Sequence, residues 1–459
     1  MESANVRAER QRVLHLVITR NRRVFPFRCA DRFYGSGRLT ENKDVSVQTV
    51  KKTWIGRYGL RQGLVCVAVA AALAGNLAWG GVVHSNGLNR EPLVREAYQH
   101  FYDLDYPGAV ERFERFHEQH PGDPQATALL LNAVIFQELY RLDLLDTTFY
   151  SNDGFLSGKH ATEEDPATRD RIFALADEAV READWRIGQN PKDIDALYAR
   201  GWVRSLRCAY MAMAERGFSA GFRLAMKARD DEAKVLQLDP DYVDAKLVVG
   251  VYEYVVGALP WPFKFLIGFA GINGSKSKGM EMLWDDARRG TTTSVEARTV
   301  IMLFLRREGK YLEAINVVKE LEKEYPRDFL FRLEEANLRK DAGQGMVAVA
   351  AYRELLTENT RAGYFSQARL ELATFGLGEA LRGQRHFAEA AEAYEQTALT
   401  PHVGPELKIR SFLAAGECRD AIGERQRAVN DYRASIAAGP NTSRADTARK
   451  RLQSPYRPN

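Results

Sequence analysis

The chain of 459 residues contains little cysteine and no clustered metal ligands. Its four cysteines lie far apart, so no disulfide framework is expected. Of the eight histidines only His117 and His120 are close together, and their spacing differs from the HExxH pattern of a zinc-binding helix. No nucleophile motif or cluster of ionisable residues indicates catalysis. We therefore expect no metal, no cofactor and no enzymatic activity.

The chain also lacks an excess of basic residues outside its N-terminal region. Residues 1–62 contain 14 Lys and Arg against 5 Asp and Glu, a net charge of +9, whereas the whole chain carries only +4. The remaining residues are therefore slightly acidic. A protein that binds nucleic acid needs a basic face on its folded part. We expect no nucleic-acid partner.

One hydrophobic run stands out near the N-terminus, within VKKTWIGRYGLRQGLVCVAVAAALAGNLAWGGVV, residues 50–83. Lys51, Lys52 and other basic residues precede the apolar stretch Leu64 to Leu73, and Ala72-Leu73-Ala74 supplies the small residues that cleavage requires. This order of features is typical of a bacterial secretory signal peptide.

The signal begins unusually far into the chain. Because a signal peptide normally starts at the initiator, we expect Val50 to be the true start and residues 1–49 to be a mis-annotated or disordered leader. The alternative is an uncleaved anchor, since Gly63 to Val83 is about long enough to span a bilayer. In both cases we expect residues after about 85 to be exported, either periplasmic or anchored in the inner membrane and facing outward. Residues 63–83 are then the candidate for membrane association.

The folded part contains a repeat in which an alanine precedes a proline by 12 residues. The pairs are Ala109 and Pro121, Ala179 and Pro191, Ala228 and Pro240, Ala314 and Pro326, and Ala428 and Pro440. A small residue lets two antiparallel helices approach closely, and proline ends a helix where it cannot continue. The period therefore predicts a series of helical hairpins.

Near the C-terminus the chain resembles the tetratricopeptide repeat (TPR) family. Gly416, Gly423, Ala428, Tyr432 and Pro440 lie at the spacing of its 34-residue helical hairpin. The resemblance implies an all-α, right-handed superhelical solenoid of roughly eight or nine hairpins. We expect an irregular half over residues 90–290 and a regular array over residues 291–455.

Two stretches depart from the regular repeat, so we expect two lengthened hairpins in the middle of the chain. The interval from Gly201 to Ala228 is 27 residues, 15 more than the 12 found from Gly416 to Ala428, which predicts helices about two turns longer. Between Gly250 and Gly279 lie 29 residues, which places an insertion between the two helices of one hairpin.

This second insertion contains the apolar stretch GALPWPFKFLIGFAGINGSKSKG, residues 257–279. Its apolar run is too short to span a bilayer, and its polar end lacks the GxxxxGK[ST] order of a phosphate loop. It either fills the core of its hairpin or forms an exposed element that touches a partner or a membrane face. Trp261 and Phe265 are its candidate contact residues.

The resemblance implies that the first helix of each hairpin lines a concave groove. One equivalent position near the end of these helices holds Arg306, Lys340, Arg382 and then Asp420. Because Arg306, Lys340 and Arg382 occupy equivalent positions, they can together bind carboxylates of a protein partner. Alternatively, they are ordinary charged residues on a solvent-exposed face. We therefore expect a non-catalytic TPR scaffold that binds proteins in a bacterial cell envelope. The alternative is a carrier or sensor for a small apolar or lipid-like ligand held under the 257–279 insertion.

Overall fold

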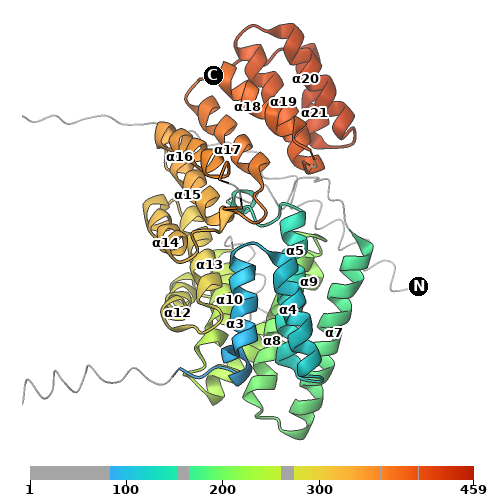
Figure 1. Cartoon of the computed structure of the whole chain (residues 1–459), viewed down its shortest axis with the longest axis vertical. Helices are drawn as coiled ribbons and strands as arrows, with labels where there is room; N and C mark the ends of the chain where they lie inside the picture. Colours follow the sequence, from blue (N-terminus) through green and yellow to red (C-terminus); the bar gives the residue numbers. More distant parts are fainter. Residues whose placement is uncertain (1–82, 152–164, 260–272, 362, 402, 459) are drawn as a thin grey trace, which may run out of the picture. The chain divides into compact units, whose positions relative to one another are not determined.

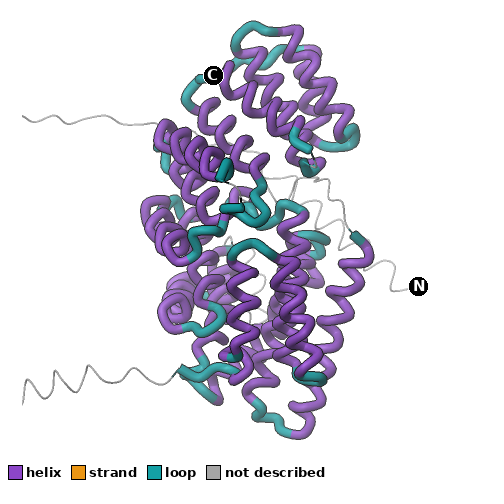
Figure 2. Tube along the Cα trace, viewed as in Figure 1, coloured by secondary structure: helices purple, strands orange, loops and turns teal. Residues whose placement is uncertain are grey.

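A computed structural model describes residues 83–151, 165–259, 273–361, 363–401 and 403–458. Within these ranges every regular element is helical, with 17 α-helices and three short 3₁₀ helices (Figure 2). The predicted all-α fold is confirmed. The candidate signal peptide or anchor, residues 50–83, and the leader, residues 1–49, lie outside the described residues except for Val83.

The helices form eight successive hairpins, followed by one terminal helix (Figure 1). The hairpins are α3 (Pro92–Tyr102) with α4 (Tyr106–Gln119), α5 (Pro124–Arg141) with α7 (Pro166–Gln189), α8 (Ile194–Met213) with α9 (Phe218–Leu238), α10 (Lys246–Ala258) with α12 (Lys276–Arg289), α13 (Ser294–Arg307) with α14 (Tyr311–Glu324), α15 (Phe329–Asp341) with α16 (Gly345–Glu358), α17 (Leu370–Gly383) with α18 (Phe387–Leu399), and α19 (Pro405–Ala421) with α20 (Arg425–Ala438). The terminal helix is α21 (Ser443–Gln453), and the 3₁₀ helices are η1 (Gly87–Arg90), η2 (Thr147–Tyr150) and η3 (Val243–Ala245). Each α-helix packs on the next one along the chain, as in a solenoid.

Small residues allow the two helices of a hairpin to pack closely, as the repeat predicts. A Cβ at Gly378 would lie 2.8 Å from the Tyr394 ring, and a Cβ at Gly416 would lie 2.6 Å from the Tyr432 ring. Both tyrosines are fully buried. Each glycine therefore leaves room for an aromatic ring of the second helix against the backbone of the first.

Aspartates begin many of the helices. Asp165, which directly precedes Pro166, accepts the backbone N–H of Ala167 at 3.2 Å at the start of α7. Asp328 does the same for Leu330 and Phe331 at the start of α15. These carboxylates satisfy backbone donors that have no partner within the helix, and their charge favours the positive end of the helix dipole.

The first lengthened hairpin is present, whereas in the second the helices α10 and α12 have the ordinary lengths of 13 and 14 residues, and residues 260–272 of its insertion lie outside the described ranges. Helices α8 and α9 contain 20 and 21 residues, whereas α13 and α14 contain 14 each, so that each long helix gains about two turns. The second insertion lies between α10 and α12, as expected from the Gly250 to Gly279 interval. A Cβ at Gly279 would lie 2.6 Å from the Gly250 carbonyl oxygen, so these two helices cross with their backbones in close approach.

The N-terminal part of the described chain also packs on much later hairpins. The backbone N–H of His84 donates to the Asp241 carbonyl at 3.1 Å, beside η3. The ring centroids of Tyr102 on α3 and Tyr325 at the end of α14 are 4.6 Å apart. Arg307, the last residue of α13, donates to the Tyr150 carbonyl in η2 at 2.7 Å. The first hairpins therefore lie against α13 and α15 through side-chain contacts between residues distant in sequence.

Candidate functional site

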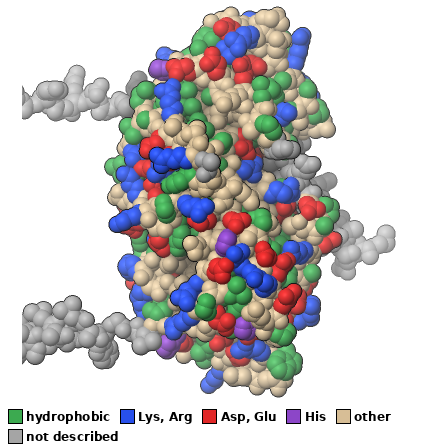
Figure 3. Space-filling model, in the orientation of Figure 1, with side chains coloured by type: hydrophobic (Ala, Val, Ile, Leu, Met, Phe, Trp, Pro, Cys, Tyr) green, Lys and Arg blue, Asp and Glu red, His purple; other side chains and the backbone are tan. Residues whose placement is uncertain are grey.

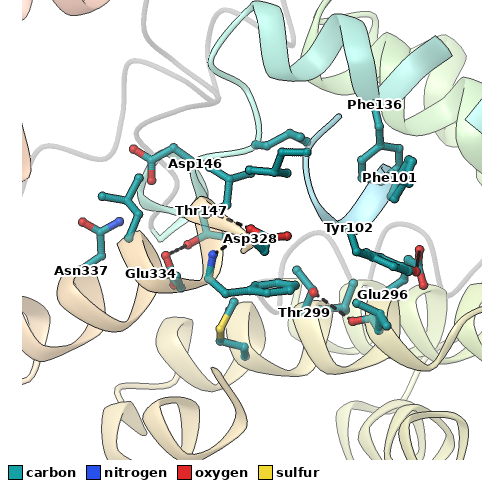
Figure 4. Close-up of a pocket in the computed structure, with 18 of the residues that line it drawn as sticks. Phe101, Tyr102, Phe136, Asp146, Thr147, Glu296, Thr299, Asp328, Glu334 and Asn337 are labelled. Atoms are coloured by element: carbon teal, nitrogen blue, oxygen red, sulfur yellow. Dashed lines mark hydrogen bonds between the residues drawn. The ribbon is translucent and has the colours of Figure 1, made fainter. Parts of the chain in front are cut away.

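A cavity of about 180 Å³ lies where α3, α5 and η2 meet α13 and α15 (Figure 4). Most of its walls are aromatic or aliphatic, and this part of the lining comprises Phe101, Tyr102, Leu104, Tyr106, Phe136, Leu145, Val295, Val300, Met302, Leu330, Phe331 and Leu333. Side-chain packing therefore leaves an apolar opening at this junction between early and late hairpins.

Four carboxylates also border the cavity, namely Asp146, Glu296, Asp328 and Glu334. None of the described residues that line it is Lys, Arg or His. The neutral polar groups are Thr147, Thr299 and Asn337. The cavity therefore has an apolar body with an acidic border.

Glu296, in the first turn of α13, lacks full compensation for its charge. The Tyr102 hydroxyl donates to Glu296 Oε1 at 2.8 Å. Its second oxygen, Oε2, is buried and has no hydrogen-bond partner within the described part of the chain. Burial raises the pKa of this carboxyl to about 7. Glu296 therefore lines the cavity and carries one buried oxygen that accepts no hydrogen bond from the described residues.

The carboxylates on the α15 side have internal partners. Asp328 accepts two backbone N–H groups of α15, and burial still raises its pKa to about 7. Glu334 accepts the Thr147 hydroxyl at 2.6 Å and pairs with Arg306 at 3.2 Å. Burial also raises the pKa of Glu334. Glu334 thus holds η2 and α13 against α15, whereas Asp328 caps the start of α15.

The predicted groove residues Arg306, Lys340, Arg382 and Asp420 occupy equivalent places. Each is the last residue but one of α13, α15, α17 or α19. The sequence therefore identified their register correctly. Their role in binding a partner stays a prediction, and the contacts described next decide how much of each side chain is accessible.

Arg306 is 3% exposed and is surrounded by internal acceptors. Its guanidinium pairs with Glu334, donates to Asp341 Oδ2 at 2.8 Å, and donates to the Thr147 hydroxyl at 2.7 Å. Lys340 lies beside the same aspartate at 3.5 Å, and its side chain is 23% exposed. The structure thus brings Arg306 and Lys340 together around Asp341, and it buries Arg306 away from any open groove.

Arg382 pairs with Glu417 of the next hairpin at 2.7 Å and keeps 27% of its side chain exposed. Its guanidinium lies over the ring of Tyr456, 5.3 Å from the centroid. Tyr456 belongs to the segment after α21, in which Pro455 and Pro458 disfavour helix. Arg382 is therefore covered in part by the chain's own C-terminal segment.

Tyr456 anchors this segment at the C-terminal ends of α17 and α19. Its backbone N–H donates to Asp420 Oδ2 at 2.8 Å. The guanidinium of Arg451 lies 4.8 Å from its ring centroid, and that of Arg382 lies 5.3 Å away. Tyr456 is half-buried, whereas its neighbours Pro455 and Arg457 are exposed. An aromatic side chain and one backbone amide thus account for this contact.

The other predicted contacts, Trp261 and Phe265, lie outside the described residues. Sequence reasoning missed Glu296, Thr147 and Tyr456. Glu296 and Tyr102 are 194 residues apart, so no local pattern relates them. The sequence SPYRPN does contain a pattern that could have indicated Tyr456, because an isolated aromatic residue lies there between two prolines.

These observations define an all-α solenoid of helical hairpins with a partly open apolar cavity where early and late hairpins meet. Solved structures with a similar arrangement include the APC/C hetero-tetramer Cut9–Hcn1, with a TM-score of 0.45 and 13% identity over 80% of this chain, and yeast Tom70, with a TM-score of 0.38 and 11% identity over 80% of this chain. A tetratricopeptide repeat protein from Parabacteroides merdae gives a TM-score of 0.32 and 17% identity over 71% of this chain. The match covers 57% of the Cut9–Hcn1 chain, 89% of the Tom70 chain and 99% of the P. merdae chain.

No protein-family model matches the sequence, and no curated protein matches it. Among the described residues, no helix combines the length and the hydropathy needed to cross a membrane. The described ranges also contain no group of three or more His, Cys, Asp or Glu placed to hold a metal ion. On the face shown in Figure 3, basic and acidic side chains are interspersed rather than gathered by sign.

Proposed function

We propose that this protein is a non-catalytic scaffold that binds an extended segment of a partner protein along the C-terminal ends of α17 and α19. The observation that supports the proposal is the docking of Tyr456 at this surface. The chain's own C-terminal segment lies there with a ring beside Arg382 and a backbone amide on Asp420. A partner segment with an aromatic residue presents the same groups and can replace it.

The chemistry of this surface favours a peptide. Two guanidinium groups, those of Arg382 and Arg451, lie within cation–π distance of one ring. Asp420 accepts a backbone donor, which any extended segment offers. Lys340, one hairpin earlier and partly exposed, extends the surface toward α15. Arg306 supports this surface indirectly, because its pairing with Asp341 holds the ends of α13 and α15 together.

The test uses a chain that ends at Gln453 and a fluorescent peptide with the sequence SPYRPN, residues 454–459. Fluorescence anisotropy is expected to show that the peptide binds the shortened chain, and that replacing its tyrosine by alanine abolishes binding. Arg382→Ala is expected to weaken binding about tenfold, since the loss of one partly desolvated cation–π contact accounts for roughly 1–2 kcal/mol.

Arg449→Ala is the matched control, because Arg449 on α21 is a partly exposed arginine that pairs with Asp446 on the surface. It is expected to leave peptide binding unchanged. Circular dichroism melting of each variant shows whether the solenoid is still folded. The proposal would be overturned if the peptide fails to bind a folded shortened chain. It would also be overturned if Arg382→Ala and Arg449→Ala weaken peptide binding equally.

We further propose that the protein acts in a bacterial cell envelope after export. The support is the order of basic, apolar and small residues in 50–83. Cleavage after Ala74 would leave intact the segment from His84 that packs beside η3. N-terminal sequencing of the protein from fractionated host cells tests this: a start at Gly75 in the soluble envelope fraction supports a cleaved signal. Recovery in membranes with residues after Val50 intact supports an anchor, and recovery in the cytoplasm contradicts export.

The carrier alternative, with a ligand held under residues 257–279, depends on an insertion of which residues 260–272 lie outside the described ranges. It stays a prediction.

A further inference from the structure

We propose that the cavity between α3, α5, η2, α13 and α15 binds a small apolar amine, with its body among the aromatic walls and its ammonium group beside the carboxyl group of Glu296. This site is separate from the peptide surface on α17 and α19, and the inference does not depend on the proposed scaffold function. The ligand class follows from the size of the cavity, the chemistry of its walls and one unused acceptor.

The volume sets the size of the ligand. A cavity of about 150 Å³ lined by apolar side chains holds benzene. The space here is about 180 Å³, which admits one aromatic ring and one or two further atoms. Phe101, Leu104 and Leu333 form buried wall, whereas Leu145 and Val300 are partly exposed. The ligand would therefore enter past η2 and the outer side of α13.

The charge of the lining selects a cation. Four carboxylates and no Lys, Arg or His border the cavity among the described residues. Aromatic faces also attract cations through their quadrupoles, and Phe101, Tyr102 and Phe331 supply three such rings. An anion would meet the carboxylates of the lining at low dielectric, and a neutral molecule would leave the Glu296 carboxylate without a cation.

Glu296 is the acid best placed to receive the ammonium group. Asp328 already accepts two backbone N–H groups, and Glu334 accepts both Thr147 and Arg306. Asp146 accepts the backbone N–H of Thr148 at 2.9 Å. Only Glu296, among these four, has a buried carboxyl oxygen without a hydrogen-bond partner among the described residues. In Figure 4 its side chain lies beside Tyr102 at one end of the group of lining residues.

Occupancy would also join distant parts of the chain. The cavity wall combines residues of the first two hairpins, such as Tyr102, with residues of α13 and α15, such as Glu296 and Phe331. A ligand that contacts both sides stabilises the packing of the early hairpins on the later ones. The site is therefore suited to a sensor whose ligand tightens the solenoid.

The experiment measures calorimetric binding of benzylamine and of benzyl alcohol, its neutral isostere, to the full chain at pH 8. Benzylamine is expected to bind at least about tenfold more tightly, which corresponds to one added ionic contact. In Glu296→Gln this preference is expected to disappear while the neutral probe still binds. Val300→Phe fills the cavity and is expected to abolish binding of both probes.

Glu313→Gln is the matched control, because Glu313 is an exposed glutamate on α14. This variant is expected to keep the wild-type preference for benzylamine over benzyl alcohol. Equal binding of the two probes to the wild-type chain would reduce the site to a plain apolar cavity and overturn the proposal, as would the absence of binding by either probe. The wild-type comparison requires no variant, so a variant that fails to fold does not obscure the result.

The affinity for benzylamine is also expected to rise about tenfold from pH 6 to pH 8. The amine stays protonated in this range, whereas the Glu296 carboxyl ionises with a pKa of about 7. The titratable and charged groups that act on it from the surrounding elements and from α13 itself are Tyr98, Tyr102, Tyr106, Asp244, Asp286, Tyr325 and Arg298. A flat pH profile would contradict a role for Glu296.

Discussion

Arg306 and Asp341 join the C-terminal ends of α13 and α15, the first helices of two successive hairpins. The Arg306 Nε donates to Asp341 Oδ2 at 2.8 Å, and the two residues are 35 positions apart. Arg382 and Glu417 repeat the arrangement at the same separation of 35 positions, between α17 and α19. The step of about one repeat shows that these pairs hold neighbouring hairpins in register.

We predict that Arg306→Ala lowers the free energy of unfolding by about 3–5 kcal/mol. Removal of the guanidinium leaves the buried Glu334 carboxylate without its cation and leaves Asp341 without its strongest partner. Chemical denaturation measures the change. Arg449→Ala, which breaks an exposed pair, is expected to change stability by less than about 0.5 kcal/mol. If the two variants lose similar amounts of unfolding free energy, burial of the Arg306 ion pair does not contribute to stability.

We predict that Gly279→Ala destabilises the hairpin of α10 and α12 by about 1–3 kcal/mol. The new Cβ would lie 2.6 Å from both the Gly250 carbonyl oxygen and the Tyr254 backbone nitrogen, so that the helices must move apart. Gly188→Ala in α7 is the matched control, because no atom lies within 4 Å of its Cβ position. Alanine there is expected to raise stability by up to about 1 kcal/mol through helix propensity. Thermal unfolding distinguishes the two, and a gain in stability with Gly279→Ala would refute the close crossing.

We predict that stability falls as the pH rises from about 5 to 8. Burial raises the pKa of Glu296, Asp328 and Asp431 to about 7. Between pH 4.5 and 7 the folded chain therefore binds more protons than the unfolded chain, which lowers stability as the pH increases. Urea denaturation at several pH values measures this slope.

The variant Glu296→Gln is expected to reduce that slope, because a glutamine stays neutral at every pH. At pH 8 it should be more stable than the wild type by up to about 3 kcal/mol, since one pKa unit corresponds to about 1.4 kcal/mol. At pH 5 the two chains should differ by less than about 1 kcal/mol. An identical difference at both pH values would mean that Glu296 does not ionise in this range.

We predict that deletion of residues 454–459 has a small and local effect. Tyr456 is half-buried and makes one backbone hydrogen bond to Asp420, so its loss is expected to lower stability by about 1 kcal/mol. Hydrogen exchange should accelerate at the ends of α17 and α19 and remain unchanged in α13 and α15. A uniform acceleration over all hairpins would contradict the local docking of this segment.

Periodic features of the fold could be predicted because each depends on residues within one or two hairpins. The spacing of Gly416, Ala428 and Tyr432 specifies which residues meet inside a hairpin, since helix geometry relates residue number to direction. The 15 additional residues after Gly201 were assigned to longer helices for the same reason. The register of Arg306, Lys340 and Arg382 was also predictable from the repeat.

The partners of those cations were harder to anticipate. Acidic residues are frequent throughout the chain, and the sequence does not say which of them faces a given arginine. Thr147 lies 159 positions before Arg306, in a segment without repeat character. Its contact with Arg306 depends on how far the first hairpins reach across the later ones.

The sequence by itself determined the helical hairpins, their number to within one, the lengthened pair α8 and α9, the place of the second insertion between α10 and α12, and the equivalent positions at the C-terminal helix ends. These features follow from local period, helix length and small residues at crossings. Only the tertiary structure decided that the first hairpins pack on α13 and α15, that a cavity remains between them, and that Glu296 keeps an unpaired oxygen there. The reason is that such contacts join residues up to about 230 positions apart, as Arg369 and the Tyr140 carbonyl do, and small rotations accumulated over several hairpins set which side chains meet.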